Sequence, residues 1–389
     1  MKKNLLLLLA ITALINLSVC LSAMAADRTN VTDYGAVPND GQDDTDAINN
    51  AIGAGQSIYF PPGTYNCNHR LNVPGGKSYR FYGDGPGVSI IHFNSSEGGI
   101  VGVMGENTLT VEGLSLLADA GNAGTAIWAL FTNANFRTAT IHNVQIGGSA
   151  RDGTSGGWWT YGIYLQEGGH SVIDKVEISG NKNATQAGIW LDAPSGAVTG
   201  FDLSNLEVKW CNSALKTSGH TEGLYLTGFE FISCGWGGLP AADLSNSGGG
   251  AIQLVNGTVD SVAGGVFLTD QTFVKISNVR FVHTGPEVSH GTMLYLHNGF
   301  GATVSQCSFY GVDPGTGWYE NGIYVESMAS VQLNGNNFNH MQPAGGSCIV
   351  ALGGATTALR ITDNLFSNVG SQYYIDPAVP SPYFLGNNP

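Results

Sequence analysis

The amino-acid sequence predicts an all-β solenoid, a parallel β-helix of about ten coils. Three observations predict it. A first repeat reads small, aliphatic, aromatic, aliphatic, as in Gly188-Ile189-Trp190-Leu191. A second repeat has mostly Asn or Gly at its third place and returns every 22–32 residues from about Leu109 onward. The 56 glycines supply turns, while a hydrophobic fraction of 42% supplies a core. A period in this range is typical of solenoids, whose repeats stack as coils.

Residues 1–25 are predicted to be a secretory signal peptide. Two lysines open the chain, residues 5–19 form an apolar run, and Ala23-Met24-Ala25 is a small-x-small cleavage site. We therefore expect a secreted or periplasmic protein. Two alternatives stay open, a lipoprotein-type cleavage before Cys20 and an uncleaved anchor. No later stretch is long and apolar enough to span a membrane.

Residues 26–389 are predicted to form one β-helix domain. We expect an N-terminal cap and first coil over 27–70 and a C-terminal cap over 371–389, with no linker between them. The formal net charge is −14, and basic residues are not clustered. Nucleic acid is therefore a poor candidate partner. The sequence leaves the oligomeric state open.

A polar stretch, residues 39–45, precedes the first predicted helix. It contains Asp43 and Asp44 and is followed by apolar residues at helical spacing. Acidic side chains at a helix start accept free backbone N–H groups, so we assign these two residues to capping rather than catalysis. Residues 57–65 then form a predicted strand ended by Pro61-Pro62-Gly63.

Residues 31–65 as a block resemble the N-terminal signature of the pectate lyase superfamily, in particular its polygalacturonase, rhamnogalacturonase and epimerase-like group. The resemblance implies a right-handed, single-stranded parallel β-helix whose first coil is plugged by the predicted capping α-helix. It extends to the fold of nearly the whole chain after the signal peptide, and it is specific for fold rather than for activity.

Each coil is predicted to contain three short strands. A residue that tolerates the left-handed conformation, such as Asn205, bends the chain sharply between two of them. In the strand that follows this bend, Val208 and Phe231 point inward on adjacent coils. Cys211 and Cys234 each come three places later, so they are predicted neighbours, either bridged or as two stacked thiols.

Aromatic residues dominate the outward positions of the first strand and the loops that enter it. Alternation along the strand predicts this outward column: Trp128, Tyr164, Trp190, Lys216, Pro240, Phe267, Tyr295, Tyr324 and Val350. Flat aromatic rings bury the C–H faces of sugars, which predicts a polysaccharide-binding surface. Cross-strand stacking is the structural alternative. The predicted substrate-binding residues are Trp128, Trp158, Trp159, Tyr164, Trp190, Trp236, Tyr295, Trp318 and Tyr324.

Charged residues on the same face are the catalytic candidates. A second outward column, two places further along the strand, carries Asp192, Ala242, His297 and Glu326. Asp192 and Lys216 suit β-elimination from a uronide, which needs a base and a group that neutralises the sugar carboxylate. Glu320 and Glu326 suit hydrolysis, which needs two carboxylates. His297 completes the set.

A third column consists of Glu177, Glu207 and Glu230 on the strand after the bend. Three adjacent acids repel one another unless they are compensated. Either a bound Ca²⁺ or Lys175 and Lys209 would do this, and a solvated acidic ridge is the plainer interpretation. We predict no metal site and no cofactor, with Ca²⁺ as the open possibility.

The catalytic motifs of polygalacturonases are missing. Their Asn-Thr-Asp and paired-Asp positions correspond to Thr160-Tyr161-Gly162 and Gln186-Ala187-Gly188, and only His290-Gly291 is faintly similar to their Gly-His-Gly motif. The Asp-Pro-His motif of alginate epimerases is also absent from the sequence. Two hypotheses therefore remain: an exported polysaccharide lyase or glycoside hydrolase, and a non-catalytic glycan-binding or cell-surface protein.

Overall fold

A computed structural model of the chain describes residues 28–132, 138–150, 152–154, 156–182, 184–245, 250–284, 290–311, 319–341, 347–353 and 356–388. The predicted signal peptide lies outside the described residues. Among those ranges, no helix is long and apolar enough to cross a bilayer.

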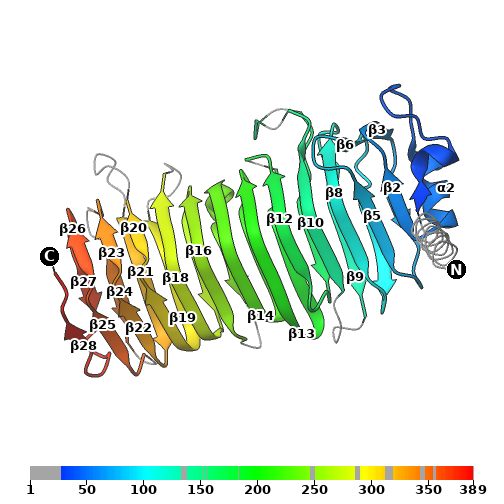
Figure 1. Ribbon diagram of the computed structural model, residues 1–389. Coiled ribbons are helices and arrows are strands. Elements are labelled where there is room, and N and C mark those ends of the chain that lie inside the picture. The colour runs from blue at the N-terminus through cyan, green and yellow to red at the C-terminus, as the bar shows by residue number, and fades with distance from the viewer. Residues whose placement is uncertain are drawn as a thin grey trace, which may run out of the picture.

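The chain winds into a right-handed parallel β-solenoid of about 11 turns, with a helix over its N-terminal end (Figure 1). The predicted fold class is confirmed. The second sequence repeat starts only near Leu109 because the earlier turns lack its single-residue bend. In the first two coils the chain passes from the second strand of the coil to the third through Pro61-Pro62 and through residues 84–88.

The first face of the solenoid is built from one strand of each coil. It comprises β4 (Leu71–Val73), β7 (Ile100–Gly105), β9 (Thr125–Phe131), β11 (Tyr161–Gln166), the starts of β13 (Ala187–Lys209), β14 (Ser213–Cys234) and β19 (His290–Ser305), and β15 (Pro240–Ser245), β17 (Gly264–Thr269), β21 (Tyr319–Met328), β24 (Ile349–Leu352) and β27 (Tyr373–Ile375).

The second and third faces meet at the bends, and long strands continue across them. The second face comprises β1 (Thr29–Asn30), β2 (Ser57–Phe60), β5 (Tyr79–Gly83), the starts of β8 (Leu109–Ala118), β10 (Ala139–Gly148), β12 (Val172–Ser179), β16 (Ile252–Ser261) and β18 (Thr272–His283), parts of β13, β14 and β19, and β22 (Val331–Asn334), β25 (Leu359–Thr362) and β28 (Tyr383–Leu385). The third face comprises β3 (Gly63–Cys67), β6 (Ser89–Phe93), the ends of β8, β10, β12, β13, β14, β16 and β18, and β20 (Ser308–Tyr310), β23 (Asn337–Asn339) and β26 (Leu365–Ser367).

The N-terminal cap is the helix α2 (Thr45–Ala54), which follows the 3-10 turn η1 (Val31–Tyr34). Ile48, Ala51 and Ile52 are buried against the first coils. This helix therefore shields the apolar end of the core from water, as the sequence predicts.

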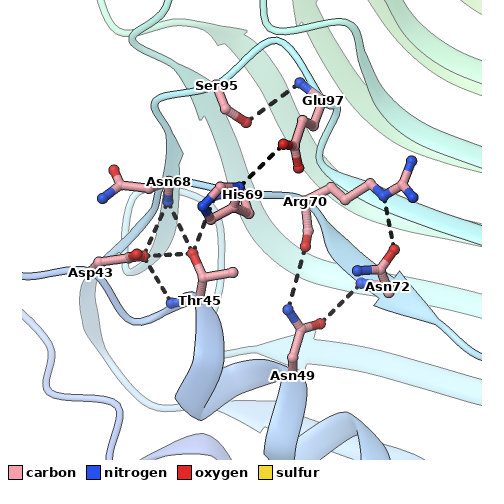
Figure 2. Close-up of polar contacts among 9 residues, drawn as sticks. All are labelled: Asp43, Thr45, Asn49, Asn68, His69, Arg70, Asn72, Ser95 and Glu97. Atoms are coloured by element: carbon pink, nitrogen blue, oxygen red, sulfur yellow. Dashed lines mark hydrogen bonds and ion pairs between the residues drawn. The ribbon is translucent and has the colours of Figure 1, made fainter.

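The acidic residues before α2 have structural partners, as predicted. Asp43 accepts hydrogen bonds from the backbone N–H groups of Thr45 (3.0 Å) and Asn68 (3.1 Å), which ties the helix start to the first coil (Figure 2). Although burial acts to raise it, a hydrogen bond from the Thr45 hydroxyl and these two N–H bonds hold the pKa of Asp43 below its usual value. Asp44 accepts from the N–H groups of Val37 and Asn66. These contacts fix both carboxylates within the cap.

Single residues in the left-handed conformation make the bends between the second and third faces. Asn143, Asn205, Asn256 and Asn278 have φ between 52° and 56°. Asn and Gly adopt this conformation at least cost, which explains the third place of the second sequence repeat. Buried amides stabilise the later bends, because Asn364 Oδ1 accepts a hydrogen bond from the Asn336 N–H at 2.9 Å.

Inward side chains form continuous stacks along the axis. The rings of Phe281, Phe309, Phe338 and Phe366 lie 4.8–5.1 Å apart and nearly parallel. Cys307 is buried among apolar residues, as expected. Cys211 and Cys234 are buried neighbours with free thiols, which donate to the Lys209 and Val208 carbonyls at 3.5 Å. Of the two predicted states, the structure therefore contains the stacked thiols.

Candidate functional site

The outward side chains of the first face form one column, which we call the aromatic strip. Its members lie opposite one another on successive coils: Trp128, Tyr164, Trp190, Lys216, Asp243, Phe267, Tyr295, Tyr324 and Val350. Adjacent strands lie about 4.8 Å apart, so the strip runs along the solenoid axis. The predicted column is confirmed except at one position.

Asp243, rather than Pro240, faces Lys216 in this column. Pro240 instead begins β15 and pairs with Gly264. Ala242, predicted to point outward in the second column, is buried. Both predicted positions are therefore wrong by a shift of the strand.

A longer entry into β15 causes the shift. The 3-10 turn η2 (Trp236–Gly238) follows Gly235, which has a φ of 93°. It delays the strand, so that Ala242-Asp243-Leu244 takes the aliphatic, outward, aliphatic positions. Asp243 stands where the other copies of the repeat mostly carry an aromatic residue. The run Ala242-Asp243-Leu244, with two apolar residues around one outward residue, is the sequence signal for this register.

A platform of three rings lies in the N-terminal half of the strip. Tyr164 and Trp190 stack with centroids 4.4 Å apart and planes 10° from parallel. Tyr161, from the same strand as Tyr164, packs at 5.2 Å from the Trp190 ring. All three side chains are partly exposed.

Hydrogen bonds around Asp192 hold this platform. Its carboxylate accepts from the hydroxyls of Tyr164 (2.9 Å) and Ser218 (2.5 Å) and from Gln166 Nε2 (3.3 Å). Trp190 Nε1 in turn donates to Ser218 Oγ at 2.7 Å. Burial, and then the bond to Asp192, raise the pKa of Tyr164 well above its usual value. Both stacked rings are thus fixed through one carboxylate.

The centre of the strip combines a cation and an acid. Lys216 Nζ lies 4.8 Å from the centroid of the Trp190 ring, in a cation–π arrangement. Asp243 occupies the neighbouring position on the next coil. An ammonium and a carboxylate therefore separate the N-terminal platform from the aromatic residues that follow.

A second group of rings lies beyond this centre. Tyr295 packs edge-on against Phe267 and Tyr324, both at 5.3 Å, and stacks on His297 at 5.5 Å. Its hydroxyl donates to Glu326 Oε2 at 2.7 Å. His297 and Glu326 are partly exposed. The structure thus brings together these two catalytic candidates with Tyr295 and Tyr324.

Trp159 does not belong to the candidate surface. Only 2% of it is exposed, its Nε1 donates to the Gly147 carbonyl at 3.1 Å, and its ring packs against Phe93. Its burial excludes contact with a ligand, which corrects its assignment as substrate-binding. Alternating patterns do not apply to loops, so no sequence pattern distinguishes the buried Trp159 from the neighbouring Trp158.

Of the remaining predicted loop residues, the structure describes the side chains of Trp158 and Trp236. Trp158 is partly exposed. Trp236 belongs to η2, donates to the Ser233 carbonyl at 2.6 Å, and has Lys182 Nζ at 5.4 Å from its ring. Trp318 lies outside the described residues. Glu320 is described only in its backbone, within β21.

The predicted acidic column is confirmed on the third face, where Glu177, Glu207 and Glu230 lie on successive coils. Lys209 Nζ bridges Glu207 at 2.6 Å and Glu177 at 3.2 Å. Burial acts to lower its pKa, but these two partners raise it overall. Lys209 is thus one of the two compensating lysines that were predicted.

Among the described residues, no group of three or more His, Cys, Asp or Glu side chains is arranged to hold a metal ion. The possibility of Ca²⁺ therefore stays a matter for direct measurement.

Known proteins that are similar to this chain share its fold. A family model described as rhamnogalacturonase A/epimerase, pectate lyase-like, matches residues 28–237. No curated protein matches the chain in a sequence comparison.

Solved structures share the solenoid at low sequence identity. The mannuronan C-5 epimerase A-module from Azotobacter vinelandii is 15% identical with a TM-score of 0.55, covering 92% of this chain and 99% of that chain. A mutant tailspike protein of E. coli bacteriophage HK620, in complex with a pentasaccharide, is 12% identical with a TM-score of 0.61, covering 94% and 72%. The N-terminal fragment of bacteriophage phi29 gene product 12 is 14% identical with a TM-score of 0.56, covering 92% and 70%. At these identities the likeness shows the fold.

Proposed function

The chain belongs to the rhamnogalacturonase A/epimerase, pectate lyase-like family, and on that premise we propose that it is an exported protein that binds a polysaccharide along the aromatic strip and cleaves it. The family description and the pentasaccharide complex of the HK620 tailspike support a polysaccharide as the partner. The signal-like segment in the sequence supports export.

The single observation that carries the proposal is the fixed Tyr164–Trp190 stack. A sugar ring binds best to an aromatic surface that is already in place, because no side-chain freedom is lost on binding. Asp192 and Ser218 hold both rings by hydrogen bonds. The second group around Tyr295 lies further along the same axis. A linear glycan lying along the strip would contact both groups.

Cleavage by β-elimination fits the centre of the strip. Lys216 would neutralise the carboxylate of a uronide, and Asp243 would accept the proton from the carbon next to that carboxylate. The electron pair of the broken C–H bond then forms the ring double bond to the neighbouring carbon, and the glycosidic oxygen departs with its bonding pair and takes a proton from water. Asp243 thereby replaces Asp192 as the preferred base, because it lies in the aromatic strip itself, opposite Lys216 on the next coil.

The test is an assay on a panel of uronide and neutral polysaccharides, with and without Ca²⁺. New unsaturated ends would report elimination, and new reducing ends without unsaturation would report hydrolysis by a carboxylate pair such as Glu320 and Glu326. Asp243→Asn and Lys216→Met should abolish elimination. Asp202→Asn, on the exposed second face, is the matched control. Full activity in Asp243→Asn would contradict the proposal.

Binding without cleavage is the second candidate, and one observation favours it. The two described carboxylates of the second outward column, Asp192 and Glu326, each accept a tyrosine hydroxyl. Such a carboxylate positions a ring instead of acting on substrate. Retention of a polysaccharide with neither kind of new end, across the whole panel, would favour this candidate.

A further inference from the structure

A groove of about 840 Å³ runs along the bends between the second and third faces. The aromatic strip lies on the first face, so the two surfaces are separate. Bend side chains such as Asn205 and Asn256 form one wall, and the column that includes Glu207 and Glu230 forms the other. We propose that this groove is a second binding site, for a neutral, hydroxyl-rich glycan chain.

The groove extends over successive coils with a regular spacing. Its second wall runs through Gln145, Glu177, Glu207, Glu230 and Thr258, which are register partners. Each coil therefore adds one residue to each wall about every 4.8 Å. This spacing is close to the length of one sugar residue in an extended chain, so each coil can meet one residue.

The charges along the groove balance. Glu177, Glu207 and Glu230 are matched by Lys175 and Arg280 in the lining and by Lys209, which bridges the first two acids. The chain as a whole has a formal net charge of −14. A balanced groove on an acidic protein does not select a polyanion or a polycation by long-range attraction. Hydrogen bonding to hydroxyls is the chemistry that remains.

The first wall has a gap at Gly228. Asn205 and Asn256 occupy the equivalent bends on the two adjoining coils, whereas Gly228 has no side chain there and a φ of 63°. A Cβ on Gly228 would lie 3.2 Å from Asn205 Oδ1. The gap gives access to Glu230, whose side chain is exposed on the opposite wall.

The groups around the gap suit a sugar diol. Glu230 only accepts hydrogen bonds, and two neighbouring hydroxyls can donate to its two oxygens. Asn256 Oδ1 already accepts from Asn278 Nδ2 at 2.8 Å, which leaves the Asn256 amide N–H groups to donate. Thr258 can donate as well. A sugar hydroxyl can donate to Glu230 and accept from Asn256 or Thr258, so hydroxyl groups satisfy all three side chains.

The test uses affinity electrophoresis of the full chain in gels that contain galactan, arabinoxylan or mixed-linkage β-glucan. Gly228→Asn fills the gap with the residue that neighbouring bends already carry in the same left-handed conformation. Gly335→Asn is the matched control, because Gly335 has a φ of 64° at a bend beyond the groove and its Cβ would meet only Gln306, at 4.0 Å. Glu230→Gln keeps the shape and removes the charge. Thermal unfolding checks that all three variants fold.

We expect at least one of these glycans to retard the protein, at low and at high salt alike. Gly228→Asn and Glu230→Gln should weaken that binding by about tenfold, while Gly335→Asn and Trp190→Ala leave it unchanged. Three results would each overturn the proposal: no retardation by any of the three glycans, loss of binding at high salt, or loss in Trp190→Ala with retention in Gly228→Asn. Failure of the aromatic strip to bind would leave this test unaffected.

Discussion

The Tyr164 hydroxyl donates to the Asp192 carboxylate at 2.9 Å, from one coil earlier and two positions back along the strand. Tyr295 and Glu326 repeat this diagonal pair at 2.7 Å. In two places along the strip, an acid of the second outward column thus fixes an aromatic ring by a hydrogen bond. We therefore interpret Asp192 and Glu326 as positioning residues for the strip.

Replacing Tyr164 with Phe tests this interpretation. The ring and its stacking on Trp190 are kept, but Asp192 loses one of its donors. We expect the free energy of unfolding to fall by about 1 kcal/mol, the usual net contribution of one such hydrogen bond. Urea unfolding measures it, with Tyr310→Phe on an exposed third-face side chain as control. Equal losses in the two variants would contradict the diagonal pair.

Replacing Trp190 with Ala removes the platform itself. We expect the polysaccharide that the strip binds to be held more weakly by about 1 kcal/mol or more, because a central aromatic contact is lost. Affinity electrophoresis or calorimetry measures the change. Tyr225→Ala, which removes an exposed ring from the second face, is the control. Unchanged affinity in Trp190→Ala would exclude the stack from the binding site.

Much of the architecture is predictable because a solenoid repeats its constraints. Positions such as Ile189 and Leu191 alternate with Trp190, and most bends carry Asn or Gly, so the register of one coil predicts the next. Asp43 and Asp44 are predicted to belong to the cap from local chemistry as well, because acidic side chains at a helix start accept free backbone N–H groups. These predictions needed no knowledge of long-range contacts.

The failures come where the repeat is interrupted. The turn after Gly235 shifts β15 and exchanges Pro240 for Asp243 at the centre of the strip. Trp159 lies in a loop, where no alternation predicts which side chain is buried. The Asp192 hydrogen bonds depend on side-chain rotamers across three coils, which a sequence pattern does not contain.

The Cys211–Cys234 pair should behave as two unreactive thiols. The hydrogen bond to Cys234, and then complete burial, raise the pKa of Cys211 far above its usual value, so little thiolate forms near neutral pH. We expect the native protein to resist iodoacetamide at both positions and the denatured protein to react at both. Mass spectrometry of peptides from non-reduced protein reports the outcome. A linked pair of peptides would show that the bridge forms instead.

Replacing Lys209 with Met should destabilise the protein in a pH-dependent way. Lys209 compensates Glu177 and Glu207, so its loss leaves neighbouring carboxylates to repel one another, and we expect a cost of about 1–2 kcal/mol at neutral pH.

The pKa of Lys209 is raised above its ordinary value of 10.5 by these partners, against the effect of burial. A raised lysine pKa contributes stability that is complete below the unfolded value and is lost as the pH rises through the folded value. The difference between the parent and the variant should therefore be constant from neutral pH to about pH 10 and shrink above it. Denaturant unfolding across this range measures the difference, and Lys275→Met, an exposed lysine of the second face, is the control. A difference that persists undiminished at strongly alkaline pH would show that Lys209 acts through packing rather than charge.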